Sequence, residues 1–175
     1  MGGSGSGFNG VKKARVEDAL VLNVNSLVRK KALVPGSWTR GAWCWTYDGD
    51  GASHSSIGYE ADLCDQDRAW LRLEYRRNDE PVDYKVKLVT TKPNYGGTRW
   101  WFICPLVRQD GGPPRRVGKL YLPSGQKYFG SRAGHDLTYT SCQESGKDRR
   151  FFSRLAEETG LDDDVVRRVL RGKAA

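Results

Sequence analysis

The chain has 175 residues, with 29 Lys or Arg, 21 Asp or Glu and a formal net charge of +8. This length allows one compact domain with a hydrophobic core, or such a domain with a small appendage. No apolar run reaches the length of a membrane span, and the N-terminus lacks a secretory signal pattern, so we expect a soluble, cytoplasmic protein without membrane contact.

The positive charge is concentrated in one part of the chain. Residues 84–134 hold ten basic side chains and one acid, a net of +9, whereas residues 40–83 hold five basic and ten acidic side chains, a net of −5. Such clustering favours a surface that faces a polyanion. The alternative is that long basic side chains merely keep loops solvated.

The first segment is expected to be a flexible tail followed by a short helix. Residues 1–10 are rich in Gly and Ser and should be flexible. Residues 12–33 look helical in their second half, with Asn25 or Ser26 as the cap and Val34-Pro35-Gly36 as the stop. The apolar stripe of this helix is formed by Leu22, Leu27 and Val28.

Four segments of the next part alternate apolar and polar residues with a period of two, which predicts strands. They are residues 43–47, 57–63, 71–75 and 82–88. Together with the preceding helix they predict an antiparallel meander over residues 11–97, with one apolar and one charged face. Turns are expected at Asp48–Gly51 and Asn78–Pro81. On the charged face, cations and carboxylates of residues 72–76 and 83–87 can pair.

A second β unit is predicted over residues 98–142, with strands at Trp100–Pro105 and Val117–Leu122. Because neighbouring side chains of a strand point to opposite faces, Trp100 and Trp101 cannot share one core. We expect the aromatic residues here to be mainly core, with some of them available as stacking platforms. These residues are Trp100, Trp101, Phe102, Tyr121, Tyr128 and Phe129.

Three segments of the sequence together resemble a largely uncharacterised bacterial family, often found on phages and other mobile elements. They are Gly96-Gly97-Thr98-Arg99-Trp100-Trp101-Phe102-Ile103-Cys104-Pro105, Lys119-Leu120-Tyr121-Leu122-Pro123 and His135-Asp136-Leu137-Thr138-Tyr139. The resemblance covers residues 1–145. It implies a zinc ribbon, in which two cysteine knuckles on β-hairpins supply four thiolates.

This sequence departs from the ribbon pattern at three of the four ligand positions. Cys104 remains, but Val107 stands where the second thiol is expected, and Ser131 and Gly134 occupy the second knuckle. One thiolate of four cannot hold zinc. We therefore expect a zinc-ribbon-like unit that keeps its shape without metal, and an α+β fold for the whole chain.

Catalytic chemistry is not expected. The four cysteines are too far apart for a knuckle or a dense disulfide framework and are predicted to be packed or free thiols. An alternative ligand set, Cys104 with His135 and Cys142, matches no established spacing. His54 lies in a polar loop, and His135 is expected to hydrogen-bond locally. The sequence predicts no catalytic residue, no metal and no cofactor.

The C-terminal residues 143–175 are predicted to be helical. Leu155–Leu170 resembles the helix-turn-helix of lactose-repressor-like regulators, with Gly160 in the turn. The first turn of the second helix is Asp162, Asp163 and Asp164, which suits a helix N-terminus but repels a phosphate backbone. The alternative is an ordinary pair of helices packed on a sheet or a partner.

The leading hypothesis is a non-catalytic nucleic-acid-binding accessory protein of a phage or mobile element, with DNA favoured over RNA. The expected contacts are Arg99, Arg115, Arg116, Lys119, Lys127 and Arg132, with Arg167, Arg168 and Arg171 on the last helix. The alternative is a phage-encoded inhibitor of a host nucleic-acid-processing protein. Its expected contacts are Glu60, Asp62, Asp65, Asp67, Asp79, Glu80, Asp83, Asp162, Asp163 and Asp164. A third is a scaffold or dimerisation module.

Overall fold

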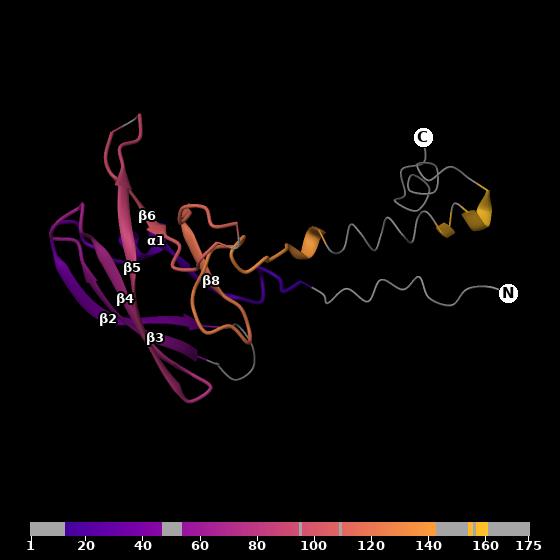
Figure 1. Cartoon of the computed structure of the whole chain (residues 1–175), viewed down its shortest axis with the longest axis horizontal. Helices are drawn as coiled ribbons and strands as arrows, with labels where there is room; N and C mark the ends of the chain where they lie inside the picture. The colour runs from indigo at the N-terminus through magenta and orange to yellow at the C-terminus, as the bar shows by residue number, and fades with distance from the viewer. Residues whose placement is uncertain are drawn as a thin grey trace. The chain divides into compact units, whose positions relative to one another are not determined.

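The computed structural model describes residues 13–46, 54–94, 96–108, 110–142, 154–155 and 157–160. The chain divides into two compact units, residues 1–137 and residues 138–175. The first unit is mostly antiparallel strands with one short helix, an α+β arrangement dominated by strands (Figure 1). Its elements are β1 (Leu20–Asn23), α1 (Val24–Arg29), β2 (Trp38–Thr46), β3 (His54–Asp62), β4 (Trp70–Arg77), β5 (Glu80–Thr91), β6 (Arg99–Ile103), β7 (Arg116–Val117) and β8 (Lys119–Leu122).

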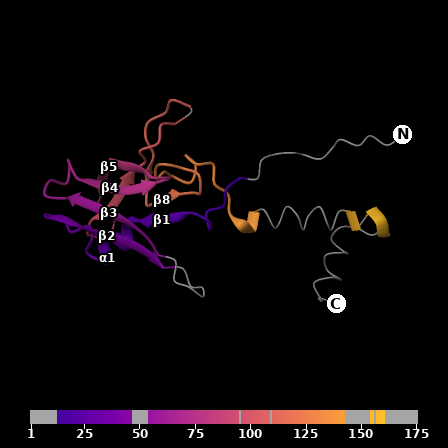
Figure 2. The ribbon, with the colours of Figure 1, turned by 90° about the horizontal axis from the view of Figure 1, so that it is seen from below.

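Six strands form one antiparallel sheet in the order β2-β3-β4-β5-β6-β7, and β1 pairs with β8 in a second, two-stranded sheet. Figure 2 shows β2 to β5 side by side, with the β1–β8 pair beside them. The predicted meander is confirmed, because every alternating segment became a strand paired with its neighbour in sequence. A period of two is the geometric signature of a strand that buries one face.

The core lies between the inner face of the large sheet and the layer formed by α1, β1 and β8. Leu71, Leu73 and Phe102 from the sheet are fully buried together with Leu27 of α1 and Leu120 of β8. Each such side chain stabilises the fold by roughly 1.5–3 kcal/mol through removal of apolar surface from water. The opposite, outer face of the sheet carries the polar half of each alternating strand.

The start of the N-terminal helix differs from the prediction. Leu22 belongs to β1, not to a helical stripe, and is buried against the core because β1 pairs with β8. The helix cap is Asn23, whose side-chain oxygen accepts a hydrogen bond from the Asn25 backbone N–H at 3.0 Å. Pairing with a distant strand therefore overrode the local helical pattern, and only Val24–Arg29 is helical.

The predicted strand Val117–Leu122 is in fact two strands with different partners. β7 pairs with β6, and β8 pairs with β1, so the chain leaves one sheet and enters the other at Gly118. The Gly118 carbonyl accepts a hydrogen bond from the Val24 N–H at 3.0 Å. Because β6 also pairs with β5, β6 and β7 of the predicted second β unit continue the large sheet, and β8 lies in the two-stranded sheet.

The turn between β4 and β5 is tighter than predicted. Asn78 and Asp79 both have left-handed backbone angles, with φ of 50° and 63°, as in the two-residue turns that match the twist of a hairpin. Pro81 lies in β5, opposite Arg76, and not in the turn. The other predicted turn, Asp48–Gly51, lies outside the described residues.

Of the second unit, the structure describes residues 138–142, 154–155 and 157–160, of which residues 140–142, 154–155 and 157–159 are helical. Arg154 Nε lies 3.2 Å from Glu158 Oε1, one helical turn away, and Gly160 has φ of 67°, in line with the predicted turn. The predicted second helix lies outside the described residues, and with it Asp162, Asp163, Asp164, Arg167, Arg168 and Arg171. Within the described part of the chain, no helix has both the length and the hydrophobicity needed to span a membrane.

Candidate nucleic-acid interface

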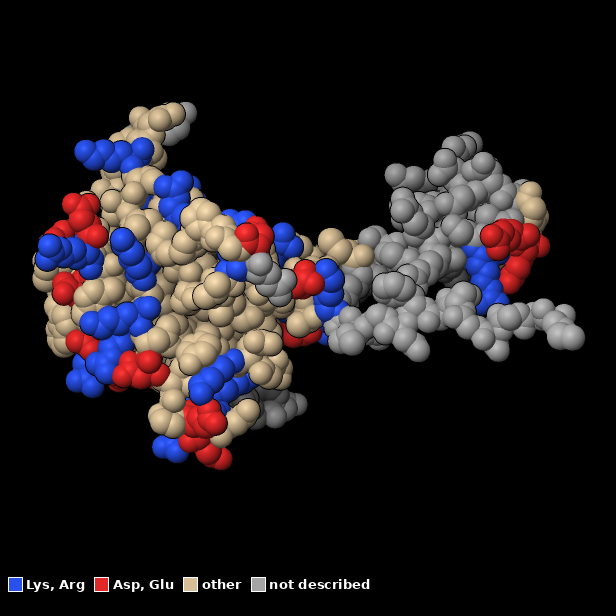
Figure 3. All heavy atoms as spheres, in the orientation of Figure 1, with Lys and Arg blue, Asp and Glu red and all other residues tan. Residues whose placement is uncertain are grey.

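One end of the outer sheet face combines exposed cations with two indole rings. By alternation along β4, β5, β6 and β7, six side chains share this face, and they extend over four neighbouring strands. We call this set the cationic face: Trp70, Lys85, Lys87, Arg99, Trp101 and Arg116. Figure 3 shows Lys and Arg side chains over the sheet, interspersed with Asp and Glu.

Trp101 is the centre of this face. The Arg99 guanidinium carbon lies 4.2 Å from the centre of its ring, and that of Arg116 lies 5.3 Å away. The indole N–H donates to Thr91 Oγ1 at 2.8 Å, which fixes the ring on the sheet. Trp100 is only 3% exposed and belongs to the inner face. The prediction that the two tryptophans point to opposite faces is confirmed.

Trp70 provides the second ring. The Lys85 Nζ lies 3.8 Å above its centre, and Lys87 is its partner in the β4–β5 register. Both lysines are exposed and the indole is half-buried. The negative charge of the ring face attracts a cation that lies over an indole. At an exposed site this cation–π contact stabilises the pair by about 0.5–1 kcal/mol. The arrangement therefore holds positive charge beside aromatic surface, with Asp62 of β3 as the other register neighbour of Trp70.

Three cations of this face form no ion pair with any residue that the structure describes. Among the residues that the structure describes, no carboxylate lies within 4.0 Å of Lys87, Arg99 or Arg116. Such cations keep their full attraction for an external anion, and only water and salt screen them.

The middle of the same outer face behaves differently. Arg72 contacts Glu60 and Glu74 at 3.2 Å each and Asp83 at 2.5 Å, which confirms that cations and carboxylates pair across the strands. The hydrogen bonds from Arg72 hold the pKa of Asp83 below its ordinary value. Arg72 is shared by three carboxylates, so this part of the outer face holds paired charges and differs in this respect from the cationic face.

The other predicted cations lie elsewhere. Lys127 Nζ lies 2.6 Å from Glu80, and the Arg132 guanidinium donates to the Leu137 carbonyl at 3.2 Å. Lys119 is on β8, in the second sheet. Of the predicted set within the described residues, the structure brings only Arg99 and Arg116 together over one ring.

Sequence reasoning missed Trp70, Lys85 and Lys87 as parts of the site. The signal was present, because both lysines alternate with buried Val86 and Leu88 and must point outward. The sequence alone does not give the pairing of β4 with β5 and of β5 with β6, which brings these residues onto one surface.

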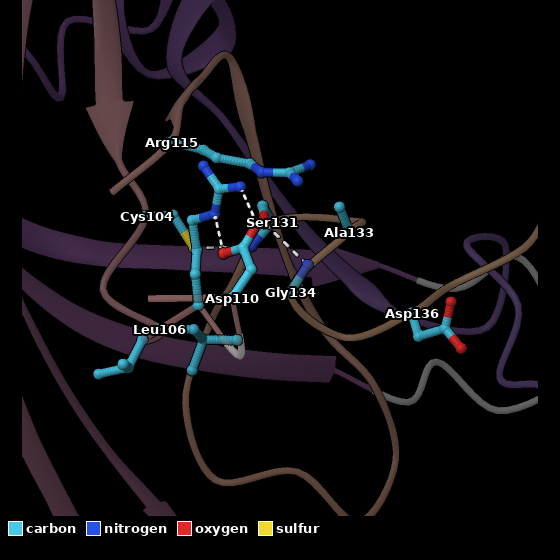
Figure 4. Close-up of a pocket in the computed structure, with 10 residues that line it drawn as sticks. Cys104, Leu106, Asp110, Arg115, Ser131, Ala133, Gly134 and Asp136 are labelled. Carbon is cyan, nitrogen blue, oxygen red and sulfur yellow. Dashed lines mark hydrogen bonds and ion pairs between the residues drawn. The ribbon is translucent and has the colours of Figure 1, made fainter. Parts of the chain in front are cut away.

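A cavity of about 480 Å³ lies between the loop after β6 and residues 131–136 (Figure 4). The Ser131 N–H donates to Cys104 Sγ at 3.2 Å, and the Gly134 N–H donates to Ser131 Oγ at 2.9 Å. Arg108 pairs with Asp110 at the rim. The residues that the family resemblance assigns to two knuckles therefore lie side by side. Arg115, a predicted nucleic-acid contact, also lines this cavity.

The knuckle positions do not form a metal-ligand set. A side chain at Gly130 or Gly134 would meet the side chain of Leu106. Cys104 is buried and its sulfur accepts a backbone hydrogen bond. Over the described residues, no three His, Cys, Asp or Glu side chains are grouped so as to hold a metal. The loop arrangement is held by packing and by hydrogen bonds to Cys104 and Ser131.

His135 makes the local hydrogen bond that the sequence predicts. Its Nε2 donates to the Tyr128 carbonyl at 3.1 Å, and burial lowers the pKa of its imidazole. A lowered pKa means that the unfolded chain binds the proton more tightly than the folded chain does. The stability that neutral His135 contributes is therefore complete above pH of about 6.5 and is lost as pH falls through the lower folded value.

We expect His135→Gln, which can keep a donor to Tyr128, to reduce the loss of stability on acidification. The free energy of unfolding should fall less steeply for the variant than for the wild type between about pH 7 and about pH 5. Urea unfolding of both proteins across this range measures the difference. Parallel curves for the two proteins would show that His135 does not titrate in this way.

The acidic residues predicted as a protein-binding surface are partly engaged inside the chain. Asp62 Oδ1 accepts the Cys64 N–H at 3.0 Å, Asp65 Oδ1 accepts the Asp67 N–H at 2.9 Å, and Asp65 lies 3.9 Å from Arg68. Ion pairs to Arg72 or Lys127 engage Glu60, Asp83 and Glu80. The acidic turn between β3 and β4 is nevertheless exposed, with Asp65 and Asp67 at the surface.

Chemically, the cationic face offers unpaired positive charge beside two planar apolar rings. A ligand with repeated negative charges and flat rings complements both features. No protein-family model, no curated protein and no solved structure matches this chain.

Proposed function

We propose that this chain is a non-catalytic nucleic-acid-binding protein whose cationic face contacts the phosphate backbone. The observation that carries the proposal is the pair Arg99 and Arg116 over Trp101, with no carboxylate partner for either guanidinium among the described residues. Arginine binds phosphate oxygens through its planar fork of donors, and unpaired surface cations attract polyanions over a distance of about 10 Å at moderate salt.

The biological setting is part of the same proposal. The resemblance of residues 96–105, 119–123 and 135–139 to a family of phages and mobile elements supports an accessory role there, with DNA as the favoured ligand. Residues 98–142 are then a ribbon-like unit that kept its loop arrangement without metal, supported by the 3.2 Å contact of Ser131 with Cys104. Residues 143–175 serve as a helix-turn-helix-like positioning element.

The test is binding of labelled single-stranded and duplex DNA and RNA at increasing salt, followed by fluorescence anisotropy. We expect the logarithm of the affinity to fall linearly with the logarithm of salt, by about 0.7 per neutralised phosphate for a single strand and about 0.9 for a duplex. Absence of binding at low salt, or binding that salt does not weaken, would overturn the proposal. Capture of a host protein through the acidic turn is the outcome that the inhibitor alternative predicts.

A matched pair of lysine variants locates the contact. Lys87→Gln removes an unpaired charge from the cationic face, so we expect weaker binding and a salt slope that is shallower by about 0.7 on single strands. Lys127→Gln removes the same charge from a lysine that is paired with Glu80, and we expect affinity and slope to stay close to wild type. Equal effects of the two changes would place the contact elsewhere.

A further inference from the structure

We propose that the ligand of the cationic face is a single strand, with two of its unpaired bases stacked on Trp70 and Trp101. This inference rests on the proposed function and narrows its ligand class. Phosphate contacts alone do not separate single strands from duplexes, whereas aromatic platforms do, because base faces are free only where bases are unpaired.

The spacing of the two rings excludes stacked, paired bases as their ligand. Trp70 pairs with Lys87, and Trp101 pairs with Val89, so the tryptophans lie two strands and two residues apart. This places their Cα atoms about 12 Å apart on a regular sheet. Successive bases of a duplex are separated by about 3.4 Å and cover each other's faces. Only a strand with splayed bases can therefore use both rings.

The cations that now lie over the rings can move to phosphates. Lys85 Nζ and the Arg99 guanidinium cover the two rings at 3.8 and 4.2 Å, and both side chains are exposed and flexible. A phosphate offers these cations a full negative charge, which an indole face does not. Movement of the cations to the backbone would expose the rings to bases in the same step.

A third tryptophan on the same face, Trp38, contacts a carboxylate, whereas Trp70 and Trp101 contact cations. Trp38 is 52% exposed, more than is usual for so large an apolar side chain. Its indole N–H donates to Glu60 at 3.1 Å, whereas Trp70, which shares Asp62 with Trp38 as a register partner, has Lys85 over its ring. Glu60 on the Trp38 indole repels a phosphate backbone, and among the described residues no cation lies over this ring, so Trp38 is not part of the proposed path.

The test compares Trp70→Ala and Trp101→Ala with Trp38→Ala as the matched control. The probes are labelled oligo(dT) and oligo(U), their duplexes with the complementary strands, and heparin as a polyanion without bases. We expect each of the first two variants to bind the single strands about tenfold more weakly, with an unchanged salt slope because no charge is lost. Binding of duplex and heparin should change little, and Trp38→Ala should bind like wild type.

The outcomes separate this inference from the proposed function. Equal affinity for single strand and duplex, with no effect of the two variants on single strands, overturns stacking while nucleic-acid binding stands. If the wild-type protein binds none of the probes, both the stacking inference and the proposed function are overturned. If an alanine variant does not fold, Trp70→Phe and Trp101→Phe keep a smaller ring and should weaken single-strand binding by about twofold to threefold.

Discussion

Replacement of both Arg99 and Arg116 by glutamate is expected to weaken nucleic-acid binding by roughly two orders of magnitude at moderate salt. The change converts two unpaired positive charges over Trp101 into two negative ones. Both charges lie at the site of the proposed contact with the phosphate backbone. Each lost phosphate contact removes the favourable release of a counterion, and each new carboxylate repels the phosphate backbone. Both arginines are exposed, so the fold should be retained.

The control for this double variant changes the same number of charges on the same face. Arg40 and Arg76 are exposed on the outer face but lie outside the cationic face. They are on the side of the sheet where Arg72 pairs with carboxylates. Arg40→Glu with Arg76→Glu should weaken binding by only a few fold, through net charge alone. If anisotropy titrations give the same loss for both double variants, the attraction comes from the net charge and not from a localised site.

Replacement of Phe129 by alanine is expected to destabilise the first unit by about 3–5 kcal/mol. The ring is fully buried, is stacked on Trp45 at 6.1 Å between ring centres, and meets Tyr75 edge-on at 5.8 Å. Its backbone N–H donates to the Tyr84 hydroxyl at 2.9 Å. Phe129 therefore anchors the segment after β8 to the inner face, and its removal leaves a cavity that surrounding strands cannot close.

The neighbouring Tyr128 provides the control for Phe129→Ala. Its ring is 42% exposed and meets Tyr84 edge-on at 5.2 Å, so Tyr128→Ala should cost only about 1 kcal/mol. Chemical denaturation of both variants measures the two losses on one scale. A loss for Phe129→Ala no larger than that for Tyr128→Ala would mean that this segment does not contribute to the core.

The strands that could be predicted are those whose evidence is local. Along β4 and β5, Leu71, Leu73, Val86 and Leu88 alternate with charged residues, and the buried face can be read from them directly. The opposite orientation of Trp100 and Trp101 also follows from strand geometry alone. These features need no knowledge of which strand lies beside which.

The features that could not be predicted depend on long-range pairing. Nothing local distinguishes the strand Leu20–Asn23 from the start of a helix, since its partner, β8, lies about a hundred residues later in the chain. The change from one sheet to the other at Gly118 likewise depends on distant partners, since β7 pairs with β6 and β8 pairs with β1. The site depends on the same information, because Trp70 and Trp101 join one surface only through the register of β4, β5 and β6.

Photochemical crosslinking of a single-stranded oligonucleotide that carries iodouracil tests the central claim most directly, since this base links to aromatic side chains that it stacks on. With the full chain at low salt, we predict that the label is found on the peptides containing Trp70 and Trp101, and not on the one containing Trp38. Label confined to residues 143–175, or no label on the sheet in a sample that binds the strand, would contradict the assignment of nucleic-acid binding to the outer face.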